Sequence, residues 1–273
     1  MNNCQLFPVF LDSSLGRIFL LHRQAPSSGS QKGMLVIPPF ADEMNKSRHM
    51  LNLLSKRVCN EGYHVVFPDL FGTGDSQGQY KDANWDVWSS DIEAGIRYLE
   101  EQGVKEISIF AMRTGALLAA DLVSRFPGKF IKLVLWQPVI DGNMFLNQFL
   151  RLRLASSMMS GDGEKETTKG LMAKFENGET VEIAGYQISP DLALTLQKKY
   201  LKDYVDSLPD VVWLDIVSSD DREPPSINKK LVQTLRDANV NVIHDKCSGE
   251  VFWTSVEIVE LPALIDKTIS CLQ

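Results

Sequence analysis

Short apolar runs alternate with longer amphipathic stretches along most of this sequence. The runs have the length and composition of buried strands, and the stretches carry apolar residues at helical spacing. In the stretch 85–101, for example, Trp85, Trp88, Ile92 and Leu99 fall on one stripe. This alternation predicts an α/β fold with a doubly wound, mostly parallel sheet. The expected strands are 34–37, 63–68, 107–111, 132–136, 211–217 and 240–243, and the expected helices are 44–60, 85–101, 114–125, 226–238 and 256–272.

Two parts of the chain depart from this alternation. Residues 5–11 and 17–23 are both β-rich and are joined by a short polar turn, which predicts an N-terminal hairpin. Residues 141–207 contain an alternating stretch at 179–186 and a helical stretch at 192–204. We therefore expect a core formed by 1–140 and 208–273, with 141–207 inserted as a small cap.

Composition narrows the classes of partner. The 28 Lys and Arg residues against 35 Asp and Glu residues give a net charge of -7, which argues against nucleic acid and anionic membranes as partners. No apolar run approaches the roughly 20 residues of a membrane span, and the N-terminus lacks the features of a signal peptide. Cys4, Cys59, Cys247 and Cys271 have no CxxC spacing, so we expect reduced thiols in a cytoplasmic location and no metal site. We also expect no cofactor.

The segment 107–116, ISIFAMRTGA, has the layout of a nucleophile elbow. An apolar strand runs into a small-residue helix through a sharp turn, as in the G-x-S-x-G motif. Arg113 stands where that motif carries the attacking serine. A guanidinium stays protonated and only donates hydrogen bonds, so it cannot attack a carbonyl group.

A second motif strengthens this interpretation. Residues 69–78, DLFGTGDSQG, match D-x-x-G-x-G-x-S-x-G and stand between the first parallel strand and the elbow. With both motifs, nearly the whole chain resembles the α/β-hydrolase family. Residues 39–48 (PFADEMNKSR), the 69–78 block and residues 112–118 (MRTGALL) are similar to the bacterial subgroup of hydrolase-like proteins associated with the exosortase A system and exopolysaccharide production.

The resemblance implies positions for a catalytic site. The acid after the seventh strand would be Asp221, next to Asp220, and the histidine after the eighth strand would be Val251. The backbone amides of Phe40 and Thr114 would form the oxyanion hole. The serine and the histidine of a Ser–His–acid triad are therefore both replaced, and only the carboxylate remains.

Arg113 has two possible roles. With the amides of Thr114 and Gly115 at a helix start, it could bind the carboxylate, phosphate or sulfate group of a ligand. It could instead reach across the vacant histidine position and form an internal ion pair with Asp221 or Asp220. The Thr114 hydroxyl is expected to cap the helix.

Two further residues are candidates for the site. His244, near the end of the last strand, is either an acid–base group or a histidine bonded to backbone. Glu250 is either a base in the pocket or a solvated loop residue. Two functions therefore stay open: an ester or thioester hydrolase in an exosortase or exopolysaccharide setting, or a catalytically inactive hydrolase-fold protein that binds an anionic ligand or an assembly partner.

Overall fold

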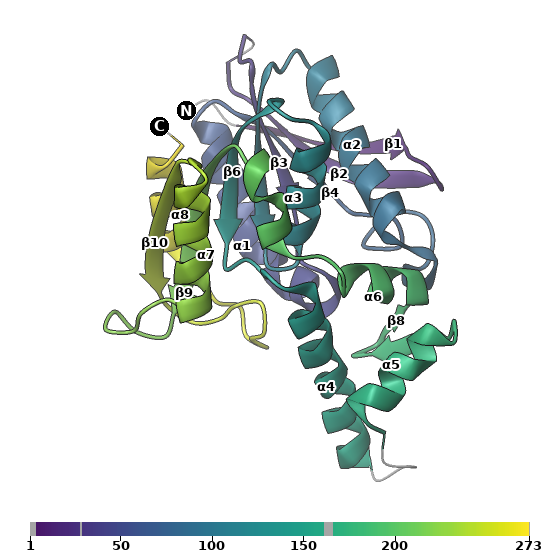
Figure 1. Ribbon diagram of the computed structural model, residues 1–273. Helices are drawn as coiled ribbons and strands as arrows, with labels where there is room; N and C mark the ends of the chain where they lie inside the picture. Colours follow the sequence, from purple (N-terminus) through teal and green to yellow (C-terminus); the bar gives the residue numbers. More distant parts are fainter. Residues whose placement is uncertain (1–3, 28, 161–165, 273) are drawn as a thin grey trace.

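The computed structural model describes residues 4–27, 29–160 and 166–272, and its centre is a sheet (Figure 1). Within these ranges the sheet has eight strands in the order β1-β2-β4-β3-β5-β6-β9-β10. The strands from β4 to β10 are parallel, and β1 and β2 add an antiparallel hairpin at one edge. The predicted sheet and hairpin are thus confirmed. The bounds are Gln5–Asp12 (β1), Arg17–Gln24 (β2), Lys32–Ile37 (β3), His64–Pro68 (β4), Glu106–Met112 (β5), Phe130–Trp136 (β6), Asp210–Val217 (β9) and Val242–Ser248 (β10).

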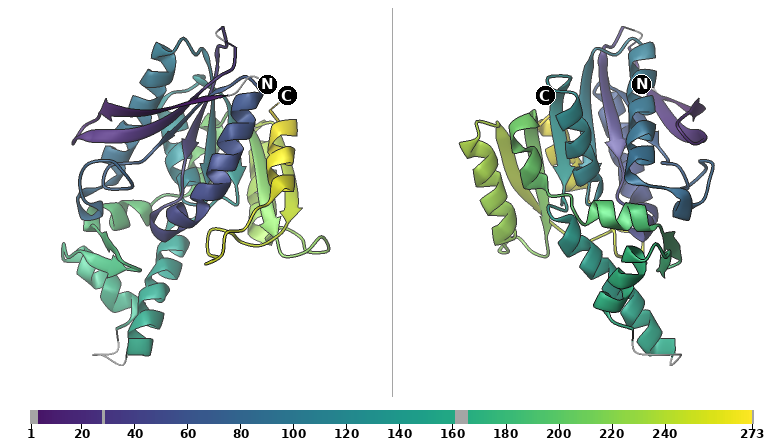
Figure 2. Two further views of the ribbon diagram at one scale, coloured as in Figure 1. Left: turned by 180° about the vertical axis from the view of Figure 1, so that it is seen from behind. Right: turned by 45° about the vertical axis from the view of Figure 1, so that its right-hand side comes forward.

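Helices cover both faces of the sheet (Figure 2). On one face, α1 (Ala41–Asn60) and α8 (Pro262–Ser270) pack against one set of strand residues. On the other face lie α2 (Trp85–Glu101), α3 (Gly115–Arg125) and α7 (Ser226–Asp237). Successive strand residues alternate between these two apolar layers, as Val36 and Ile37 do. Burial on both faces explains why the central strands are almost continuously apolar.

The cap elements lie beyond the carboxyl ends of the strands (Figure 1). They are α4 (Gly142–Ser160), α5 (Thr168–Glu176), the hairpin β7 (Val181–Ile183) and β8 (Tyr186–Ile188) and α6 (Pro190–Leu196). The 3-10 helix η2 (Leu201–Ser207) then returns along the face of the sheet and packs against α3 and α7. The predicted helix 192–204 is therefore wrong as one helix, because the chain leaves α6 and bridges at Tyr200 before η2 begins. Residues 161–165 of the predicted cap lie outside the described residues.

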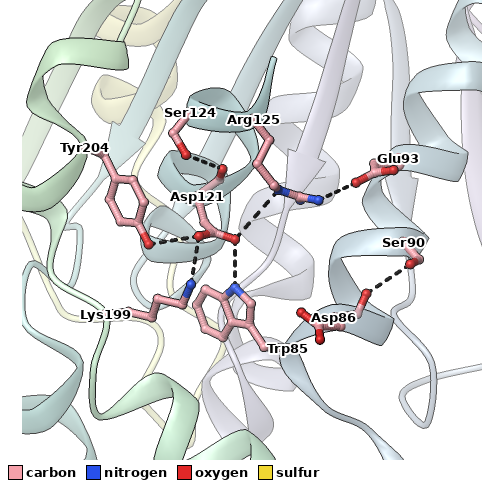
Figure 3. Close-up of polar contacts among 9 residues, drawn as sticks. All are labelled: Trp85, Asp86, Ser90, Glu93, Asp121, Ser124, Arg125, Lys199 and Tyr204. Carbon is pink, nitrogen blue, oxygen red and sulfur yellow. Dashed lines mark hydrogen bonds and ion pairs between the residues drawn. The ribbon is translucent and has the colours of Figure 1, made fainter. Parts of the chain in front are cut away.

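One carboxylate fastens the base of the cap to the core (Figure 3). Asp121 of α3 accepts hydrogen bonds from Lys199 Nζ at 2.8 Å, Tyr204 OH at 2.9 Å and Trp85 Nε1 at 3.0 Å. Burial alone would raise the pKa of Asp121, but the bonds from Lys199 and Trp85 outweigh it and hold the pKa below its usual value. The charged carboxylate therefore joins α2, α3 and the segment that returns from the cap.

Two predicted elements near the C-terminus are shifted. β10 covers 242–248 instead of 240–243, so His244 lies inside the strand and not near its end. The last helix covers 262–270 instead of 256–272, because Pro262 occupies its first turn and Val256 and Ile258 are exposed. None of the described helices is long and apolar enough to cross a bilayer.

The prediction of four reduced thiols is wrong for two of them. Cys4, next to β1, forms a disulfide with Cys59 near the end of α1. The β1–β2 hairpin folds back beside α1, which brings together two cysteines that are 55 positions apart. Such proximity depends on the fold and is not visible in cysteine spacing. Cys247 and Cys271 are free.

Candidate functional site

Arg113 forms the elbow between β5 and α3 at the carboxyl edge of the sheet. Its backbone has φ +52°, a left-handed conformation that costs a non-glycine residue about 1–2 kcal/mol. The Arg113 N–H donates to the Trp136 carbonyl at 3.1 Å, and its own carbonyl accepts from Val139 N at 3.0 Å. A Cβ at Gly115 would lie 2.5 Å from the Pro38 carbonyl oxygen, so the turn also requires the glycine. The predicted elbow geometry is present.

Two more residues near this edge have a left-handed backbone. Ala41 begins α1, four positions after β3, with φ +51°, and Gln137 directly follows β6 with φ +40°. Because β3, β5 and β6 are adjacent in the sheet, three left-handed residues lie along one stretch of its carboxyl edge. Strained backbone of this kind is concentrated at sites that position side chains.

The side chain of Arg113 pairs with Glu43 in the first turn of α1. Arg113 Nη2 lies 2.9 Å from Glu43 Oε1, and Arg113 Nε lies 3.1 Å from Oε2, so the contact is bidentate. Both side chains are 17% exposed. Burial raises the pKa of the Glu43 carboxyl, and the Arg113 guanidinium opposes that shift. An internal ion pair is thus present, but the predicted partners Asp221 and Asp220 are wrong.

Two more groups surround the guanidinium. Its Cζ lies 5.2 Å from the centre of the Trp253 ring, within cation–π range. Its Nη1 lies 3.5 Å from the carbonyl oxygen of Gln137. The Gln137 side chain in turn accepts the N–H of Ile216 at 2.6 Å, which ties this edge of the site to β9.

The oxyanion amide predicted at Phe40 is already bonded. Phe40 N–H donates to Thr114 Oγ1 at 2.9 Å, and Thr114 is fully buried. The prediction that the Thr114 hydroxyl caps its helix is therefore wrong, because the hydroxyl faces the β3–α1 loop. The bond satisfies two buried polar groups. It also engages one of the two amides that an oxyanion hole would need.

The predicted acid and histidine positions do not join Arg113. Asp220 and Asp221 are both exposed, and neither bonds to Arg113 among the described contacts. A hydrogen bond from Ser219 holds the pKa of Asp221 below its usual value. Val251 and Glu250 are exposed and line an open cavity of about 450 Å³ together with Ser218, Gly249, Thr254 and Ser255.

One of the two roles predicted for His244 was a bond to the backbone, and the structure shows no such bond in the part of the chain that it describes. Its Nε2 lies 2.8 Å from Oδ2 of Asp215, whose side chain is fully buried. The other oxygen of Asp215 accepts from Asn228 Nδ2 at 2.7 Å and from Trp213 Nε1 at 3.2 Å. The imidazole therefore belongs to a network between β9, β10 and α7, and none of its described contacts is with the elbow.

The chain has four histidines, and all of them lie in described parts of the structure. His22 bonds to His64 and Tyr98, His49 bonds to Glu260, and His244 bonds to Asp215. In the described residues, no histidine bonds to a serine hydroxyl or a cysteine thiol. The same residues contain no group of three or more side chains that could hold a metal ion.

Sequence reasoning missed Glu43, Trp253 and Gln137 as neighbours of Arg113. The contact between Glu43 and Arg113 could have been predicted from the strand order. β3 and β5 are neighbours in the sheet, so the chain that follows β3 lies beside the elbow that follows β5. Trp253 lies two positions beyond Val251, the residue that the resemblance placed at the histidine position, and no sequence signal singled Trp253 out.

Comparisons with known proteins agree with this architecture. Residues 35–169 match the model of a hydrolase family described as serine aminopeptidase, S33. Est1E from Butyrivibrio proteoclasticus, solved with ferulic acid, is 15% identical with a TM-score of 0.69, and the match covers 97% of each chain. The chain has the α/β-hydrolase fold. The Pyrococcus furiosus esterase Pf2001 shares this fold at 14% identity and a TM-score of 0.62, over 98% of this chain and 90% of the esterase. No curated protein sequence matches the chain.

Proposed function

We propose that this α/β-hydrolase-fold protein has no serine hydrolase activity and acts by binding a ligand or a partner. The observation that carries the proposal is the Arg113–Glu43 pair, which lies at the elbow where the resemblance to α/β-hydrolases leads us to expect the nucleophile. Acyl transfer through an enzyme-bound intermediate requires a nucleophile activated by a base. Arg113 can supply neither, and the bond from Phe40 to Thr114 engages an amide that would stabilise the reaction.

The proposal that a ligand binds here rests on the N–H donors of Arg113 that do not bond to Glu43. Glu43 takes Nε and Nη2 of Arg113, while Nη1 has only a 3.5 Å contact with the Gln137 carbonyl. We expect an anionic ligand or partner to contact Nη1 from the side of the cap. Because Glu43 already compensates the charge, the binding should be selective for shape more than for charge.

The setting of this function is also a proposal. The motifs in 39–48, 69–78 and 112–118 support an association with exosortase and exopolysaccharide systems, through the resemblance alone. A cytoplasmic location stays part of the proposal, and the Cys4–Cys59 disulfide counts against it. Deleting the gene in its host and measuring secreted exopolysaccharide tests the association, and an unchanged amount would contradict it.

An activity assay tests the absence of catalysis. The purified chain, Arg113→Ala and an active hydrolase-fold esterase are compared on p-nitrophenyl esters and with a fluorophosphonate probe. We expect the chain and the variant to show neither turnover nor labelling, while the esterase shows both. Turnover by the chain that one serine or cysteine substitution abolishes would overturn the proposal.

A further inference from the structure

A second cavity lies between α1 and the hairpin side of the sheet. Its volume is about 170 Å³, room for several water molecules. Arg23 of β2 and Arg48 of α1 line it, together with Asn52 and Ser55 of α1. Leu21, Val65 and Phe67 form an apolar floor on β2 and β4. It shares no lining residue with the Arg113 site.

Arg23 lacks a carboxylate partner in the described part of the chain. Its Nε donates to Ser55 Oγ at 2.9 Å and its Nη2 to Asn52 Oδ1 at 2.5 Å, and both acceptors are neutral. Burial lowers the pKa of the Arg23 guanidinium. A partly buried cation with only neutral partners is stabilised when an anion binds beside it. Nη1 of Arg23 has no described partner and can donate to such an anion.

Arg48 adds a second positive charge, and only one of its three guanidinium nitrogens has a described partner. Its Nη2 pairs with Asp69 Oδ1 at 2.6 Å, and the other oxygen of Asp69 accepts the N–H of Asp75 at 2.9 Å. The Arg48 side chain is 34% exposed, and its Nε and Nη1 have no described partner. The two guanidinium groups and this one carboxylate leave a net charge of about +1 at the cavity.

The apolar floor narrows the chemistry of the ligand. Phosphate and sulfate are polar on every side, so they would leave Leu21, Val65 and Phe67 without an apolar partner. A short-chain organic carboxylate matches both parts of the cavity. Its head can bind the guanidinium donors, and its alkyl chain can cover the floor. We infer that the cavity between Arg23 and Arg48 is a binding site for a small aliphatic monocarboxylate.

Calorimetric titration of the full chain with sodium salts from acetate to hexanoate tests this site. We expect affinity to rise with chain length and then to fall once the alkyl chain exceeds the cavity. Arg23→Gln should weaken binding by roughly 10- to 100-fold, the loss of one charge-assisted hydrogen-bonded contact. The glutamine amide has the reach of Arg23 Nε and can still bond to Ser55, so the fold should persist, and the melting temperature checks it.

Arg57→Gln is the matched control. Arg57 lies on α1, as Arg48 does, but it does not line the cavity. Its side chain is half exposed and pairs with Asp266, so this variant should bind carboxylates like the unaltered chain. Absence of binding by every carboxylate would overturn the inference, as would equal binding by Arg23→Gln. Tighter binding of inorganic phosphate than of any carboxylate would also overturn it, because the apolar floor would then have no role.

Discussion

At the scale of single residues, the side chain of Arg113 decides which contacts the elbow makes. The elbow presents its residue at the edge of the sheet in a strained conformation. A serine there could face a substrate, whereas the longer arginine reaches α1 and lies against Trp253. The elbow therefore joins the loops after β3, β6 and β10 at the place where a catalytic elbow would hold its nucleophile.

Glu43→Gln should expose the energetic coupling of this pair. The variant leaves the Arg113 guanidinium without a carboxylate, and we expect it to lower the free energy of unfolding by about 1–3 kcal/mol, because both side chains remain partly exposed. Glu43→Gln combined with Arg113→Gln should recover part of that loss. Urea denaturation of the two single variants and the double variant measures the coupling.

Glu260→Gln is the control for Glu43, since it removes the carboxylate charge from the exposed contact with His49. It should change stability by less than about 1 kcal/mol. Strictly additive effects of the Glu43 and Arg113 substitutions would contradict a coupled pair.

His22 should make stability depend on pH. Burial, together with the neighbouring His64, lowers the pKa of His22 to about 4 in the folded chain. As pH falls from 6.5 towards 4, the unfolded chain takes up a proton that folded His22 does not, so stability is lost by up to about 1.4 kcal/mol per pH unit. His22→Gln should flatten this part of the profile, as measured by urea denaturation at several pH values. A slope identical to that of the unaltered chain would contradict this assignment.

At the scale of elements, prediction succeeded where local signals agree and failed where tertiary context decides. Helix α2 was predicted to the residue, because Asn84 caps it through a bond to Val87 N and an apolar stripe follows. β10 was placed too early, because it lies at the edge of the sheet and tolerates polar residues such as Asp245. The Arg113–Glu43 contact was missed, because it requires knowing that β3 and β5 are neighbours.

Asp121→Asn should loosen the base of the cap. The asparagine amide keeps one acceptor oxygen but lacks the negative charge that lies 2.8 Å from Lys199 Nζ. We therefore expect the free energy of unfolding to fall by about 1–3 kcal/mol. Segment 190–207 should be cut faster by a protease at low concentration, with the cleavage sites read by mass spectrometry. Asp206→Asn is the control, because Asp206 lies on the same segment, in η2, and none of the bonds to Asp121 given above involves it. Equal cleavage of both variants would contradict the anchoring role.

At the scale of the whole molecule, two fastenings connect parts that lie far apart in sequence. The Asp121 cluster joins the cap to α2 and α3, and the Cys4–Cys59 disulfide joins the N-terminal strand to α1. The hairpin strand β1 pairs with β2 alone and its residues are largely exposed. Burial of side chains stabilises such an exposed edge strand only a little. The disulfide therefore supplies a large part of the stability that keeps β1 on the sheet.

Breaking that link should destabilise the chain by about 2–4 kcal/mol, the effect expected of a cross-link that closes a loop of this length. Cys4→Ser should lower the melting temperature by several degrees under non-reducing conditions. Dithiothreitol should lower it equally in the unaltered chain and leave Cys4→Ser unchanged, whereas Cys271→Ser, which removes a free thiol, should respond to dithiothreitol like the unaltered chain. Thiol titration of the unfolded, unreduced chain should find two free thiols of the four cysteines. Four free thiols would show that β1 is held by its pairing with β2 alone, and would remove the objection to a cytoplasmic location.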